Sequence, residues 1–199
     1  MILTVEEMAK NVSKVYYRSS DWEKFEGSQW YYRASQAVSQ LASRYGLSLN
    51  TTANVVAALS PRCPWQSNLR DAENVIKFKQ EAVVTTYHNN LRIACQVLSG
   101  MVFRLNGPKT SAFAELLENP DADVVCIDTH AISVALGYKA TDERINQYGK
   151  GYGNDRVRQA YRIVSCEVGV KPSTVQAICW VSWRDRIKGL GGRKIEAVV

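Results

Sequence analysis

The sequence predicts an all-α protein. Apolar residues recur at helical spacing along most of the 199-residue chain, and glycine, proline or asparagine stands where these stretches end. The one strand-like run, residues 124–127, is too short to outweigh the helices. Hydrophobic residues make up 46% of the chain, so it can form one core or two small lobes that share a cleft.

The first half of the chain is expected to hold five helices. Residues 5–16 and 34–45 carry apolar stripes at helical spacing, and Gly46 ends the second stripe. Residues 50–52 are expected to cap a helix over 53–59, because threonine and asparagine accept hydrogen bonds from free N–H groups. Prolines at 61 and 64 break the chain before a helix over 67–78, and a further stripe covers 91–98.

Four more helices are predicted in the second half. They cover residues 110–117, which Asn119–Pro120 ends, then 129–136, 155–168 and 172–183. Residues 149–153 hold three glycines and predict a loop. We expect one compact unit with a helical lobe over about 48–137, a second lobe from 1–47 and 138–190, and a flexible tail over 191–199.

Composition points to a polyanionic partner and away from a membrane. The formal net charge is +6, and no stretch of about 18 apolar residues could span a bilayer. The N-terminus does not resemble a signal peptide, and the five cysteines show no zinc or iron–sulfur spacing. We therefore expect a cytoplasmic monomer without metal or cofactor, either nucleoid-associated or virus-encoded in a host cytoplasm.

Two helix starts carry the residues best suited to chemistry. Asp128 precedes a helix, where its carboxylate would cap free N–H groups and stay ionised, able to stabilise charge on a sugar. Lys109 opens a helix after Asn106, Gly107 and Pro108, although a cation there is unfavourable for the helix dipole. It is either an ordinary surface or phosphate-contacting lysine or a nucleophile that forms a Schiff base with a deoxyribose C1′.

Two further segments are candidates for contact with nucleic acid. The stiff connection over residues 60–66 carries Arg62, Trp65 and Gln66, and is either a rigid turn or a wedge that fills the gap left by a flipped base. Lys150 and Arg156, beside the glycines of 149–153, suit a phosphate site or a solvated face. His130 is a weaker accessory candidate at the start of the helix that follows Asp128.

These motifs resemble the helix-hairpin-helix DNA glycosylases of the endonuclease III type (HhH-GPD). Gly107-x-Lys109-Thr110 followed by Ile127-Asp128-Thr129-His130 is similar to that family's hairpin and its Val-Asp-Thr-His segment, and the resemblance covers roughly residues 50–137. It implies a two-lobed helical fold with a central cleft. It also implies that Asp128 is the catalytic aspartate, Lys109 the lysine of the bifunctional members, Gly107 the second hairpin glycine and Arg62 the residue that enters the duplex.

The sequence also departs from the family. Leu105 replaces the first hairpin glycine, and the cysteines that hold the iron–sulfur cluster have no counterpart, as in many members. The resemblance implies base excision on duplex DNA, with AP-lyase activity and the base flipped into a cleft between the lobes. The alternatives are a non-catalytic nucleic-acid-binding helix-hairpin-helix module, or a superfamily enzyme that acts in DNA base hypermodification.

Overall fold

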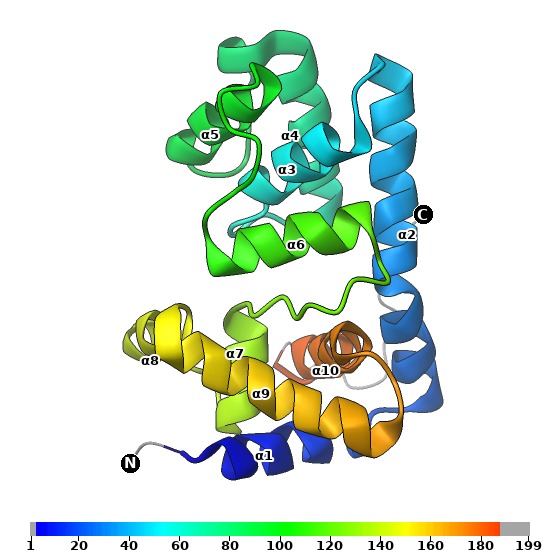
Figure 1. The fold of residues 1–199 in the computed structure, drawn as a ribbon, viewed down its shortest axis with the longest axis vertical. Helices are drawn as coiled ribbons and strands as arrows, with labels where there is room; N and C mark the ends of the chain where they lie inside the picture. The colour runs from blue at the N-terminus through cyan, green and yellow to red at the C-terminus, as the bar shows by residue number, and fades with distance from the viewer. Residues whose placement is uncertain (1–2, 188–199) are drawn as a thin grey trace. The chain divides into compact units, whose positions relative to one another are not determined.

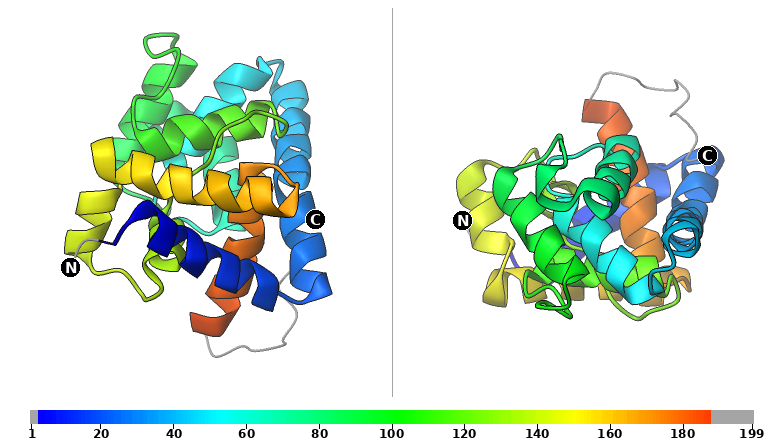
Figure 2. Two further views of the ribbon diagram at one scale, coloured as in Figure 1. Left: turned by 60° about the horizontal axis from the view of Figure 1, so that its bottom comes forward. Right: turned by 90° about the horizontal axis from the view of Figure 1, so that it is seen from above.

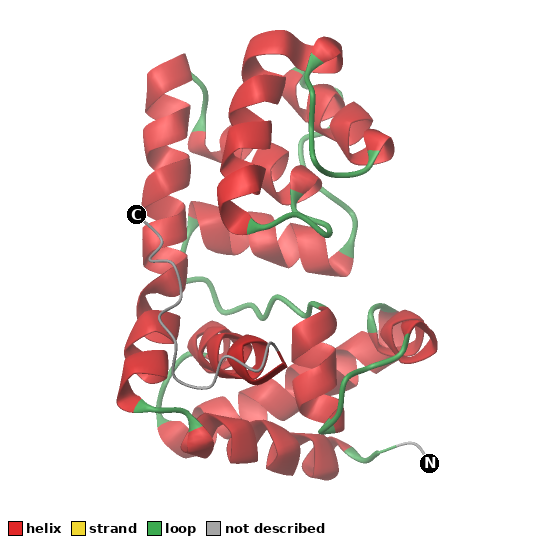
Figure 3. Ribbon diagram, turned by 180° about the vertical axis from the view of Figure 1, so that it is seen from behind, coloured by secondary structure: helices red, strands yellow, loops and turns green. Residues whose placement is uncertain are grey.

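The computed structural model describes residues 3–187, and it is helical throughout this range, with turns and loops between the helices (Figure 3). No strand occurs among these residues, so the predicted all-α class is confirmed. The predicted tail over 191–199 lies outside the described residues. Within the described part, no helix has both the length and the apolar character needed to cross a membrane.

Contacts divide the chain into two helical units. Unit 1 consists of the residues up to Arg33 and those from Asp123 onwards, and unit 2 of residues 34–122. Helix α2 (Asp21–Tyr45) runs through the first boundary. This division differs from the expected lobes, because residues 123–137 belong with the terminal helices. The reason is packing: Val125, Ile127 and Ile132 are buried against Met8 and other apolar residues of the N-terminal helix.

Unit 1 is built around helices from both ends of the sequence. Besides the first part of α2, it contains α1 (Val5–Arg18), α7 (Thr129–Leu136), α8 (Asp142–Tyr148), α9 (Gly151–Val168) and α10 (Pro172–Ile187) (Figure 1). Helix α1 begins with a capping box, in which Thr4 and Glu7 satisfy each other's backbone N–H groups. The core of the unit gathers buried residues of α1, α7, α9 and α10.

Unit 2 is organised around a buried central helix. Helix α3 (Leu49–Leu59) is buried from Thr52 to Leu59 and packs against α4 (Trp65–Phe78), α5 (His88–Leu98) and α6 (Pro108–Glu118) (Figure 2). A short 3₁₀ turn, η1 (Lys79–Glu81), follows α4. The sequence of α3 explains this position, because it is rich in alanine and valine and has no charged residue.

Some predicted helix boundaries were wrong. Helix α3 begins at Leu49, because the Ser48 hydroxyl accepts from the Thr51 N–H at 3.0 Å, so residues 50–52 lie inside the helix instead of capping it. Helix α4 begins at Trp65, directly after Pro64. Helix α5 begins at His88, three residues before the predicted apolar stripe over 91–98.

Of the predicted glycine loop over 149–153, only residues 149 and 150 lie between helices. Helix α8, which was not predicted, ends at Tyr148, and α9 begins at Gly151. A Cβ atom at Gly153 would lie 2.1 Å from the Gln147 carbonyl oxygen. This glycine therefore permits a close approach of the backbone between two helices, and glycine content alone does not distinguish such a junction from a loop.

Candidate functional site

Unit 2 brings Lys109 to the segment that joins α3 to α4. The Lys109 Nζ donates to the Ser60 hydroxyl at 3.3 Å, although 49 residues separate the two in sequence. Ser60 is the C-cap of α3, and its hydroxyl also donates to the Ala57 carbonyl at 2.9 Å. The side chain of Lys109 is half-buried. Ser60 was not among the predicted site residues, because a serine at a helix end is most often only a cap.

The start of α6 explains how Lys109 reaches this place. Gly107 is the N-cap with φ −72°, and Pro108 takes the first helical position, where its missing N–H costs nothing. No side chain caps this helix, and no acidic residue lies in its first turn. Gly107 thus lies between α5 and α6, and its extended backbone does not itself require glycine.

The hairpin residues predicted to contact DNA lie around this helix start. Asn106 and Gly107 are exposed, and Thr110 is half-buried. The Thr110 hydroxyl donates to the Gly107 carbonyl at 3.2 Å. This hydrogen bond lies within the first turn of α6, and because the hydroxyl donates in it, it does not cap the N–H groups of the helix start.

The connection over residues 60–64 is held in a defined conformation. Arg62 adopts φ 56°, which is rare for a residue with a side chain, and its exposed guanidinium lies 5.9 Å from the centroid of the Tyr87 ring. The Cys63 N–H donates to the Ser60 carbonyl at 3.2 Å, and the Thr86 hydroxyl donates to the Pro61 carbonyl at 2.9 Å. The connection is therefore a turn, and its predicted role as a wedge stays a prediction.

Two other residues of this segment differ in exposure. Trp65 is half-buried and meets the Phe113 ring of α6 edge to face, with centroids 6.4 Å apart. Gln66 is exposed on the first turn of α4. The Trp65–Phe113 contact and the Lys109–Ser60 hydrogen bond thus join the start of α6 to both ends of the connection.

A buried carboxylate supports this segment from within unit 2. Asp71 is 1% exposed and accepts from the Thr85 N–H at 2.8 Å and from the Thr85 hydroxyl at 2.5 Å. The Cys63 thiol donates to the same oxygen at 3.6 Å. Burial is the main cause that raises the pKa of Cys63, so this cysteine is a neutral hydrogen-bond donor.

Asp128 lies in unit 1 and caps α7, as predicted. Its Oδ1 accepts from the Ala131 N–H at 2.7 Å, and the side chain is half-buried. The helix ends at Gly137 with φ 80°, also as predicted. His130, one residue into this helix, is half-buried.

Buried phenols lie near Asp128, which the sequence did not reveal. Burial raises the pKa of Tyr31 and of Tyr161 well above their usual value, and the charge of Asp128 adds to both shifts. Tyr31 donates to Gln176 Oε1 at 2.8 Å, and Tyr161 donates to the Ala131 carbonyl at 3.3 Å. In the sequence, tyrosines at helical spacing look like ordinary core residues. Only the fold shows that Tyr31 and Tyr161 lie near the Asp128 carboxylate.

The two basic candidates of unit 1 differ in their surroundings. Lys150 is the exposed N-cap of α9. The Arg156 guanidinium donates to the Leu3 carbonyl and lies 5.7 Å from the centroid of the Tyr152 ring. Arg156 therefore anchors the segment before α1, and its predicted contact with DNA stays a prediction. The pairing of Lys109 with Asp128 in one cleft also stays a prediction, because the two residues belong to different units.

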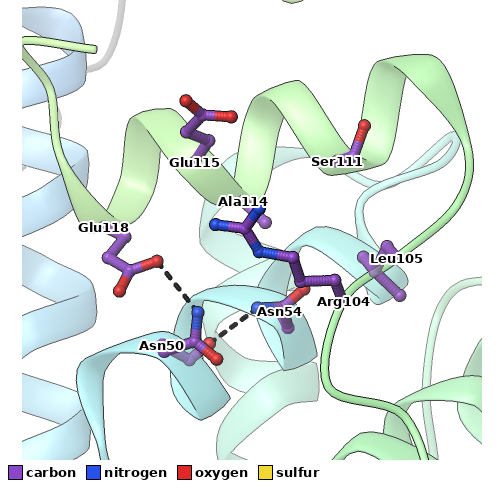
Figure 4. Close-up of a pocket in the computed structure, with 8 residues that line it drawn as sticks. All are labelled: Asn50, Asn54, Arg104, Leu105, Ser111, Ala114, Glu115 and Glu118. Atoms are coloured by element: carbon purple, nitrogen blue, oxygen red, sulfur yellow. Dashed lines mark hydrogen bonds between the residues drawn. The ribbon is translucent and has the colours of Figure 1, made fainter.

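A small polar pocket in unit 2 holds none of the predicted residues (Figure 4). In it, Asn50 Nδ2 donates to Glu118 Oε2 at 2.9 Å, and Asn54 Nδ2 donates to the Asn50 carbonyl at 2.9 Å. Arg104 extends from the segment before α6 into the space between α3 and α6. Among residues 3–187, no group of three or more His, Cys, Asp or Glu side chains is arranged to hold a metal ion.

Comparison with known proteins identifies the family of this chain. A family model described as "Family of unknown function (DUF7178)" matches residues 2–187. The chain belongs to this family. No curated protein and no solved structure matches the chain significantly.

Proposed function

We propose that this member of the family is a DNA glycosylase with AP-lyase activity, of the helix-hairpin-helix kind that its motifs resemble. One observation carries the proposal: the Lys109 amine lies 3.3 Å from Ser60, at the edge of the connection that bears Arg62. Two segments singled out for separate reasons, a nucleophile and a duplex-entering loop, thus meet in unit 2. The division of the chain into two helical units also fits a two-lobed enzyme.

In this proposal Lys109 is the nucleophile. Its neutral amine attacks the deoxyribose C1′, the bond from C1′ to the base breaks, and the departing base takes up one of the two amine protons. The other amine proton then passes to the ring oxygen as the sugar ring opens, which gives a Schiff base, and β-elimination from it cuts the strand. The Ser60 hydroxyl holds the amine in place before the sugar arrives.

In this proposal, Asp128 supplies a negative charge that stabilises the sugar during base release. Bond cleavage at C1′ places positive charge on the sugar, and an ionised carboxylate stabilises it. The hydrogen bond from the Ala131 N–H fixes the position of the Asp128 carboxylate. The buried phenols of Tyr31 and Tyr161 stay protonated at neutral pH, so they add no negative charge beside it.

The hydrogen bond between Lys109 and Ser60 also favours a second candidate function. A lysine held by a hydroxyl at an uncapped helix start is suited to a phosphate oxygen, as in a module that binds nucleic acid without catalysis. A superfamily enzyme that acts in base hypermodification is the third possibility, and it would use Asp128 without a lyase step.

A panel of duplexes, each with one modified base, tests the proposal. We expect release of one base class with strand nicking, and duplex binding that weakens steeply between low and moderate salt because the chain carries a net charge of +6. Binding without base release favours the non-catalytic module. Duplex binding that is absent, or that does not change with salt, contradicts all three functions.

A further inference from the structure

The segment over residues 99–107, between α5 and α6, presents two large apolar side chains at the surface. Met101 is 73% exposed and Phe103 is 80% exposed. Exposed aromatic and thioether groups lose the free energy that burial would provide, about 1.5–3 kcal/mol for a side chain of this size. An interaction surface would account for the exposure of both side chains on one loop.

This loop is braced at both ends. Gly100 has φ +75°, and the N–H groups of Met101 and Val102 both donate to the Gln96 carbonyl, at 3.0 and 3.2 Å. At the other end Leu105 is only 8% exposed, and Figure 4 shows it beside α6, next to Arg104. The exposed tip is therefore presented by fixed flanks, which lowers the entropy that binding would cost.

The surroundings of the tip favour a nucleobase over an apolar protein surface. Residues 99–107 contain no carboxylate, and they lead directly into Lys109 at the uncapped start of α6. A helix start with free N–H groups and a lysine suits a phosphate group. Proteins that bend or open duplexes insert phenylalanine or methionine between base steps in this manner.

We propose that Phe103, flanked by Met101, inserts between DNA bases and occupies the gap beside the nucleotide on which the protein acts. This inference rests on the proposed function and assigns the wedge to a different loop from the one indicated by the sequence. In the 60–66 connection the planar groups have intramolecular partners: the Arg62 guanidinium lies over Tyr87, and Trp65 meets Phe113. Phe103 instead presents most of its surface to solvent.

The test uses the full-length chain and a duplex with 2-aminopurine beside an abasic site. We expect wild-type protein to raise the 2-aminopurine fluorescence by unstacking it. Phe103→Ala should abolish this rise and weaken binding by roughly 5- to 150-fold, the range for loss of one stacked aromatic ring. Phe103→Trp should restore both. Val83→Ala is the matched control, because Val83 is 83% exposed on another loop of unit 2.

Each other outcome is decisive. A Phe103→Ala protein that unstacks and binds like wild type overturns the wedge, as does loss of self-association in that variant without an effect on DNA. Unstacking that depends on Phe103, together with no base release from the panel of modified-base duplexes, supports the wedge and contradicts the glycosylase. Absence of any wild-type binding to this duplex overturns both.

Discussion

Unit 1 and unit 2 hold their candidate residues in different ways. In unit 1, Asp128 caps α7 and lies near two buried phenols, so folding itself determines its position. In unit 2, Lys109 stands in the first turn of an uncapped helix and donates to the Ser60 hydroxyl at the C-terminal end of α3. The carboxylate thus caps a helix of its unit, whereas we expect the lysine, as a cation at a helix start, to add little to the stability of its own.

This contrast has a physical consequence for mutagenesis. A residue that serves both a fold and a reaction can be changed so that only one role is lost. For Asp128 the separating change is asparagine, which caps a helix as well as aspartate does but carries no charge. For Lys109 almost any uncharged replacement separates the roles, since a cation at a helix start does not stabilise the helix.

The largest expected effect is the loss of base excision in Asp128→Asn. Removal of the charge that stabilises the sugar should slow single-turnover base release by at least about 100-fold, while duplex affinity stays within about threefold. Asp155→Asn, an exposed change on α9, is the control. Excision by the Asp128→Asn protein at the wild-type rate would show that Asp128 only caps α7.

The second effect concerns the packing of unit 1. A Cβ atom at Gly27 would lie 2.5 Å from the Ile178 Cα and 2.6 Å from its backbone nitrogen, so α2 and α10 would have to move apart. We expect Gly27→Ala to lower the free energy of unfolding by about 1–3 kcal/mol in urea titrations. Gln36→Ala, exposed on the same helix, should be close to neutral. An unchanged urea midpoint for Gly27→Ala would contradict the close approach.

A third, smaller effect distinguishes the helix-capping role of Asp128 from the role of its charge. Asp128→Ala removes the acceptor for the Ala131 N–H and should cost about 1 kcal/mol more stability than Asp128→Asn. Lys109→Gln should change stability by less than about 0.5 kcal/mol. Equal stabilities of the two Asp128 variants, or a clear loss in Lys109→Gln, would remove the contrast between the units.

The smallest expected effect is a pH dependence that belongs to unit 2. The Tyr45 hydroxyl, followed by Lys77 and Arg44, lowers the pKa of Glu73 from its usual 4.5 to about 2. A carboxyl with a lowered pKa in the folded state contributes stability that is present above pH 4.5 and is lost as the pH falls towards 2. Glu73→Gln should flatten this part of the stability profile, and an unchanged profile would argue against the interaction.

Periodicity and helix-end residues were enough to predict the fold class and most helices. Gly137, Gly169 and Asn119 end their helices as predicted, because left-handed or extended backbone at these positions cannot continue a helix. The glycines of 149–153 led to a wrong helix boundary. Gly153 lies inside α9, where it permits close contact with the Gln147 backbone, and such a contact cannot be predicted from local preference.

The candidate site was predictable only in part. Asp128 and Lys109 stand at recognisable helix starts, so their local roles follow from the sequence. Ser60, Tyr31 and Gln176 became visible only through contacts between segments distant in the chain. The exposure of Phe103 likewise depends on how the loop before α6 is braced, and hydrophobicity alone would have placed it in the core.

Reductive trapping tests the central claim most directly. Wild-type protein, Lys109→Gln and Lys79→Gln are incubated with an abasic-site duplex and borohydride; Lys79 is an exposed lysine of the same unit. We predict a covalent adduct for wild type and Lys79→Gln, mapped to Lys109 by mass spectrometry of the digest, and none for Lys109→Gln. Absence of an adduct with wild-type protein, or an adduct of equal yield with Lys109→Gln, would contradict the assignment of Lys109 as the nucleophile.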